Sequence, residues 1–168
     1  MFIRDAVFSA AFLSGSAQFI GNAITGRLIT AANDGGYFAH PFTFDETPRF
    51  QLPTYAFVLV RNAGALVAAP AVVRLTLDWT IVDTLGNLQN GALAYDWPTP
   101  ANWAANAVQR VLLDNGNAET WAPNTFRRDD TVGLKLARAS SHANDTFPNS
   151  VVLATAVNVQ VQQDLPWI

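Results

Sequence analysis

The chain has 168 residues, the size of one domain with its own hydrophobic core, and a net charge of -3 at pH 7. Hydrophobic residues make up 50% of the chain, 14% are charged and none is cysteine, which excludes a disordered chain and a disulfide-stabilised scaffold. Acidic residues outnumber the scattered basic ones, so no nucleic-acid partner is expected.

We expect residues 1–36 to form an N-terminal arm or edge strands, and residues 37–168 to form the main domain. Apolar side chains recur near the start, but Gly15, Gly21 and Gly26 interrupt any long helix. The start resembles a secretory signal peptide, yet Asp5 lies where such peptides are positively charged. The apolar runs are far shorter than the roughly 20 residues of a membrane-spanning helix, so no membrane partner is expected.

Strand patterns dominate from the middle of the chain onward. Tyr55–Val60 is a short continuous apolar run, and three later segments alternate apolar and polar residues with the period of two that strands show. Turn residues such as Asp34-Gly35-Gly36 and Gly86-Asn87 punctuate the chain. The sequence therefore predicts an all-β fold, a single antiparallel β-sandwich of jelly-roll-like type. The side chains expected to face its shared core are Val73, Leu75, Leu77, Trp79, Ile81, Leu134, Leu136, Val157, Val159 and Val161.

The sequence contains no catalytic motif. Ser141, His142 and Asp145 lie close together, but a nucleophilic triad is assembled across a fold, so a polar turn is the preferred interpretation. His40 has no second His or Cys at metal-binding spacing, and no ladder of oxygen ligands for calcium surrounds Asp130. We therefore expect no enzymatic activity, no cofactor and no metal.

The aromatic segment between residues 95 and 103 allows two interpretations. Flat rings beside Asp and Asn side chains suit a carbohydrate-binding surface. Alternatively, Trp97 and Trp103 fill the end of the sandwich, and we prefer this structural role. Under the first interpretation, the residues that would bind a carbohydrate are Tyr95, Asp96, Trp97, Asn102 and Trp103.

Residues Asp130–Arg138 and Asn144–Leu153 carry a resemblance to a known family. The first segment is a strand that ends in an arginine, and the second contains Asp145-Thr146-Phe147 followed by an apolar strand. This arrangement resembles the C-terminal β-sandwich of tailed-bacteriophage virion proteins, over roughly residues 70–163. The chain departs from the family at Phe147-Pro148-Asn149, where a Tyr-Ala-Gly type of turn is commoner. The resemblance implies a jelly-roll-like sandwich and a place on a virus particle, and it implies no catalytic residues.

The kinds of charged residue also bear on assembly. The chain has nine Arg but one Lys, and eleven Asp but two Glu. Interfaces between proteins are depleted in Lys and Glu, although a β-rich chain with many Asn turns would explain the composition as well. We favour a surface that other subunits cover.

The two ends of the chain are the predicted assembly interface. Six apolar side chains near the N-terminus would exceed the usual apolar patch of a monomer if they were exposed. The alternative is that both ends fold back on their own sandwich. The interface residues predicted under the assembly hypothesis are Phe2, Ile3, Val7, Phe8, Phe12, Leu13, Trp167 and Ile168.

These observations together predict a bacteriophage virion structural protein of the capsid decoration, cement or minor capsid type, located in the virion. Its expected partners are copies of itself, arranged as a trimer, and other virion proteins such as the major capsid protein. The alternative function is a tail-associated receptor- or carbohydrate-binding module.

Overall fold

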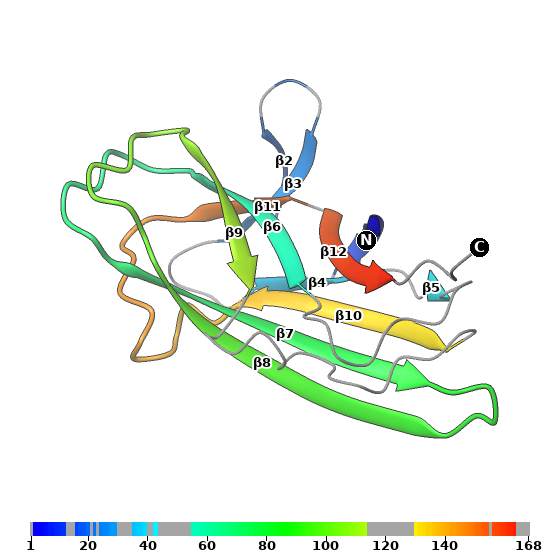
Figure 1. Cartoon of the computed structure of the whole chain (residues 1–168). Helices are drawn as coiled ribbons and strands as arrows, with labels where there is room; N and C mark the ends of the chain where they lie inside the picture. Colours follow the sequence, from blue (N-terminus) through cyan, green and yellow to red (C-terminus); the bar gives the residue numbers. More distant parts are fainter. Residues whose placement is uncertain are drawn as a thin grey trace.

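A computed structural model describes residues 2–12, 16–20, 22, 24–29, 35–39, 42–43, 55–113, 130–154 and 156–163. Across these residues the regular structure is all β-strand, without a helix, and two antiparallel sheets pack face to face as a sandwich (Figure 1). The predicted fold class is confirmed.

Both sheets are built from strands that lie far apart in the sequence. The first sheet contains β9 (Val108–Leu113), β6 (Tyr55–Asn62), β11 (Val151–Ala154), β12 (Ala156–Gln163), β1 (Phe2–Phe12), β3 (Ile24–Ile29) and β2 (Ser16–Ile20). The second sheet contains β8 (Leu88–Pro98), β7 (Val72–Val82), β10 (Thr131–Arg138), β4 (Gly35–Ala39) and β5 (Phe42–Thr43).

The pairing order is that of a jelly roll. Leaving aside the β2–β3 hairpin, one sheet runs β1-β12-β6-β9 and the other runs β4-β10-β7-β8. Strands that follow one another in the chain repeatedly change sheet, which is the winding of two Greek keys. β1 belongs to both sheets, because residues 2–9 pair with β12 and residues 10–12 pair with β4.

This pairing makes β1 the strand next to β12 in the first sheet and next to β4 in the second, at the margin of the sandwich where the two sheets meet. The boundary between residues 36 and 37 stays a prediction. Strands on both sides of that boundary pair with the C-terminal strands: β1 with β12, β3 with β11 and β4 with β10.

The core lies between the two sheets and follows the predicted alternation. Val73, Leu75, Leu77, Ile81 and Leu136 are buried. Trp79 is half-buried and packs against them. The opposite sheet contributes the buried side chains Ile29, Val58, Val60, Val111, Leu113, Val151 and Leu153. The side chains of Leu134, Val157, Val159 and Val161 lie outside the described part of the structure.

A tight turn joins β7 to β8. The carboxylate of Asp83 accepts the backbone N–H of Leu85 at 2.9 Å and that of Asn87 at 2.8 Å, and Gly86 adopts a φ of 84°. Positive φ suits a residue without Cβ, so the turn that Gly86-Asn87 predicted is confirmed. From this turn, Val82–Val72 and Leu88–Pro98 pair residue by residue without a bulge.

Gly91 is held against an aromatic ring across this hairpin. It pairs with Trp79, and a Cβ at Gly91 would lie 2.0 Å from Cζ2 of that ring. We therefore expect Gly91→Ala to displace the indole and to lower the free energy of unfolding by about 1–3 kcal/mol, measured by chemical denaturation. Gly133→Ala is the matched control, because no atom lies within 4 Å of its Cβ position. Equal effects of the two substitutions would contradict the prediction.

Candidate functional site

Three loops meet at one end of the sandwich, which we call the loop end: residues 63–71, 99–107 and 139–150. Figure 1 shows these loops at the left of the molecule. Backbone hydrogen bonds join them. The N–H of Val67 donates to the carbonyl of Trp103 at 3.1 Å, and the N–H of Ala63 donates to the carbonyl of Ser150 at 3.1 Å.

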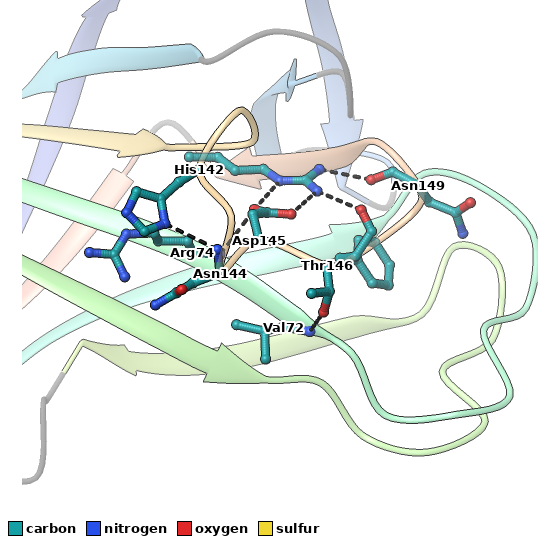
Figure 2. Close-up of polar contacts among 9 residues, drawn as sticks. Val72, Arg74, His142, Asn144, Asp145, Thr146 and Asn149 are labelled. Atoms are coloured by element: carbon teal, nitrogen blue, oxygen red, sulfur yellow. Dashed lines mark hydrogen bonds and ion pairs between the residues drawn. The ribbon is translucent and has the colours of Figure 1, made fainter.

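Arg138 holds the 139–150 loop from inside. It is the last residue of β10, and strand alternation places it on the core side after Leu136. Its fully buried guanidinium donates two hydrogen bonds to the buried carboxylate of Asp145, with N–O distances of 2.7 and 2.8 Å (Figure 2). It also donates to the carbonyl oxygens of Asn149 at 2.7 Å and Phe147 at 2.8 Å. Such complete pairing offsets the large cost of burying a charge.

The same loop is also attached to β7. The carboxylate of Asp145 accepts the backbone N–H of Arg74 at 3.0 Å. The N–H of Val72 donates to Oγ1 of Thr146 at 2.9 Å, as Figure 2 shows. The carbonyl of Val72 accepts the N–H groups of Thr146 and Phe147, both at 2.9 Å. The loop is therefore fixed to two strands of the second sheet.

Asn62 is a second buried attachment point, at the end of β6. Its Nδ2 donates to the carbonyl oxygens of Ala65 at 2.9 Å and Trp103 at 3.1 Å. Its Oδ1 accepts the N–H of Gly64 at 3.0 Å and Nδ2 of Asn149 at 3.1 Å. Because Asn149 also accepts a hydrogen bond from Arg138, the two buried side chains form one network that joins all three loops.

The outside of the loop end carries no Asp, Glu, Lys or Arg side chain. Asp145 is the only Asp, Glu, Lys or Arg in the three loops, and its side chain is 1% exposed. Leu66 is 56% exposed, and most of its exposed neighbours are Ala and Pro. A rigid, uncharged and partly apolar surface of this kind is suited to contact with another protein.

A polar cluster borders the loop end on the outer face of the second sheet. Asp96 forms an ion pair with Arg74 and accepts Nδ2 of Asn144 at 2.7 Å. Nδ1 of His142 accepts the N–H of Asn144 at 3.1 Å. Partial burial alone would raise the pKa of Asp96, but the hydrogen bonds from Asn144 and Arg74 and the nearby positive charges bring it below the ordinary 3.8.

We expect Asp96→Asn to reduce stability in a pH-dependent way. The folded-state pKa is lowered, so the carboxylate contributes stability above the ordinary pKa and loses it as the pH falls through the folded value. The pair is partly exposed, so the loss at pH 7 should be at most about 1 kcal/mol, and it should be smaller at a pH below the ordinary pKa of 3.8. Urea denaturation of both proteins at the two pH values measures this. A loss of stability that is equal at the two pH values would contradict a lowered pKa of Asp96 in the folded chain.

β8 places the predicted carbohydrate-binding residues in different surroundings. Tyr95 and Trp97 pack against the core, whereas Asp96 lies on the outer face. Trp103 is 2% exposed, and its ring meets that of Trp97 edge-on at 5.2 Å. Asn102 is exposed in a turn with a φ of 55°. The structure thus brings the two tryptophans together inside the sandwich, and carbohydrate binding stays a prediction.

The predicted assembly residues are described only in part. The backbone of β1 lies along β12 and β4, but the side chains of Phe2, Ile3, Val7, Phe8 and Phe12 lie outside the described part of the structure. Leu13, Trp167 and Ile168 lie outside it entirely. An interface at the two ends of the chain stays a prediction.

The loop that holds Ser141, His142 and Asp145 does not bring them together. His142 is exposed, whereas the carboxylate of Asp145 is directed to Arg138 (Figure 2). Within the described ranges, no group of three or more His, Cys, Asp or Glu residues is placed to hold a metal ion, and His40 lies outside them. No helix in that same part of the chain is long and apolar enough to cross a membrane.

The sequence matches no protein-family model and no curated protein. Among solved structures, the chain is similar to the enzymatically active domain of bacteriophage CBA120 tailspike protein 4, with a TM-score of 0.44 and 7% identity over 93% of this chain and 19% of that one. It is similar to the CBM22-1 xylan-binding domain from Paenibacillus barcinonensis, with a TM-score of 0.35 and 9% identity over 95% of each chain. A structure of infectious bursal disease virus gives a TM-score of 0.35 and 12% identity over 96% of this chain and 33% of that one. The chain therefore spans about a fifth of the tailspike chain and a third of the viral one.

Proposed function

We propose that this chain is a bacteriophage virion structural protein, of capsid decoration, cement or minor capsid type, that works through contacts between subunits. The observation that carries the proposal is the loop end, whose three loops expose no Asp, Glu, Lys or Arg side chain and are fixed by buried hydrogen bonds to Arg138 and Asn62. We assign this surface to the contact with another virion protein, such as the major capsid protein.

The rigidity of the loops supports a permanent contact. A protein that binds through mobile loops loses conformational entropy on binding, whereas loops already held in place lose little. Charged groups at the centre of an interface would need partners, and the loop end exposes no Asp, Glu, Lys or Arg side chain to desolvate. A particle repeats the same contact many times, so rigid loops and a surface without these side chains would each stabilise the whole assembly.

The resemblance found in the sequence supports the same proposal. The arginine and the Asp-Thr-aromatic segment that carry it are Arg138 and Asp145-Thr146-Phe147. In the structure these are the residues that fix the 139–150 loop to β10 and β7. The similarity to phage virion β-sandwiches thus falls on the groups that build the proposed contact surface.

The test is binding to particles that lack this chain. We expect the native chain to co-sediment with them, and Leu66→Asp combined with Ala143→Asp to weaken this binding by at least about tenfold, because two charges would be desolvated. Thr84→Asp combined with Leu85→Asp adds the same charge at two exposed positions in the β7–β8 turn, away from the loop end, and should bind like the native chain. Failure of the native chain to bind particles, or equal binding by both variants, would refute the proposal.

A further inference from the structure

Within the part of the chain that the structure describes, one of the two edges of β8 pairs with no strand. It is the last strand of the second sheet, and its other edge pairs with β7 along its whole length. The N–H of Asp83 donates to the carbonyl of Asn87, so this pair of residues is hydrogen-bonded. Hydrogen-bonded and non-hydrogen-bonded pairs alternate along an antiparallel ladder. Gln89, Gly91 and Leu93 therefore direct their backbone groups to β7.

The intervening residues direct their backbone N–H and C=O groups away from β7. These residues are Leu88, Asn90, Ala92 and Ala94, and all four are exposed. Among the strands that the structure describes, none pairs with this edge. The edge thus presents a row of backbone donors and acceptors to solvent.

This edge lacks the features that usually protect an open strand. Such strands commonly carry lysine, an interior proline or a bulge, which prevent pairing with another chain. β8 contains no lysine, its one proline is its last residue, and its register with β7 is unbroken. Its one charged residue is Asp96, which forms an ion pair with Arg74, and residues 88–94 are uncharged.

We propose that Leu88–Ala94 pairs with the same segment of a second copy of this chain, antiparallel and about a two-fold axis at Gly91. In this register Leu88 lies opposite Ala94 of the second copy and Asn90 lies opposite its Ala92. All the outward-directed groups then pair with one another, giving about eight hydrogen bonds between the copies. The second sheet of one copy then continues into the second sheet of the other copy.

A second copy fits this edge because the segment is complementary to itself. A two-fold contact brings each residue near its own counterpart, so any charge in the segment would tend to repel its symmetry mate. Residues 88–94 have no charge to repel, and the register places Asp96 opposite the uncharged Gly86. The narrow pair at the axis is formed by Gly91, which has no side chain.

This contact is independent of the proposed virion function. β8 and β1 are the opposite edges of the second sheet, so pairing through β8 leaves the N-terminal strand free for the predicted trimer. It also lies outside the three loops of the loop end. In a trimeric protein the β8 contact would join trimers in pairs.

The experiment is the mass in solution of the purified full chain, measured by analytical ultracentrifugation from micromolar to millimolar concentration. We expect the native chain to form an assembly with two-fold pairing. Asn90→Lys combined with Ala92→Lys should weaken that pairing about tenfold or more and halve the mass, because lysines then oppose each other across the axis. Thr84→Lys combined with Ala105→Lys adds the same charge at exposed positions outside β8 and should leave the mass unchanged.

Ala92→Pro provides a second variant that adds no charge. It removes one outward-directed N–H while the bonds to β7 remain, and an edge strand tolerates proline at such a position. It should also weaken pairing about tenfold, through lost hydrogen bonds. A native chain without two-fold pairing at every concentration, variants that still pair like the native chain, or a control that dissociates to the same extent would each overturn the proposal.

Discussion

Arg138→Met should lower the free energy of unfolding by about 3–5 kcal/mol. The guanidinium is fully buried, and its removal leaves the carboxylate of Asp145 buried without its charged partner, with one hydrogen bond from the N–H of Arg74. It also leaves the carbonyl oxygens of Phe147 and Asn149 without their donor. Equilibrium denaturation of the native chain and the variant measures the loss.

Lys135→Met is the matched control, because Lys135 also lies on β10 and also pairs with an aspartate. Its distance to Asp78 is 3.1 Å, but the two side chains are 36% and 45% exposed. Exposed pairs contribute about 0–1 kcal/mol, so this variant should stay close to the native chain. Removing both Arg138 and Asp145, as Arg138→Met with Asp145→Leu, should recover part of the lost stability, since no unpaired charge remains. A double variant as unstable as Arg138→Met alone would show that packing, rather than the unpaired charge, is responsible.

Trp103→Ala should lower the free energy of unfolding by about 3–5 kcal/mol, as expected for a large buried aromatic residue. The indole lies 5.2 Å from the ring of Trp97 and 5.0 Å from that of Phe147, measured between centroids. Its Nε1 donates to the carbonyl of Ala107 at 3.1 Å. The substitution therefore creates a cavity at the loop end and removes one of the two hydrogen bonds that the carbonyl of Ala107 accepts, while the one from the N–H of Asn62 remains.

Leu85→Ala is the control for Trp103→Ala. Leu85 is 86% exposed at the tip of the β7–β8 turn, so its loss should change stability by no more than about 0.5 kcal/mol. If Trp103→Ala were as mild as this control, the indole would not be part of the core. The indole of Trp103 would then be accessible to a carbohydrate.

The alternating strands were predictable, but β8 was not. β7 alternates apolar and polar residues over Val73–Ile81, and β10 repeats the pattern over Val132–Leu136, which is the direct consequence of one buried face. β8 begins Leu-Gln-Asn-Gly-Ala, and Asn, Gly and Ala are poor strand formers. It is a strand because the Asp83 turn places it along β7, so its conformation depends on the register of a neighbour.

The loop-end network was predictable only at the level of single residues. Arg138 follows Leu136 at strand spacing, and Asn62 follows Val58 and Val60 in the same way, so each pattern points a polar side chain inward. The partners of these side chains come from loops. Sequence spacing does not determine which carboxylate or carbonyl a loop brings to an inward-facing group, so the pairing of Arg138 with Asp145 required the structure.

The pairing of β1 with β12 determines when during synthesis the sandwich can fold. Phe2 lies opposite Gln163, so β1 completes its sheet with β12, which is synthesised much later. Figure 1 shows the N-terminus beside β12. Contacts between residues so distant in sequence slow folding, because a large loop must close before they form. The sandwich therefore closes only after β12 has been synthesised. Until then β1 exposes an unpaired edge to other nascent chains, and the time before closure is when this protein is most exposed to aggregation.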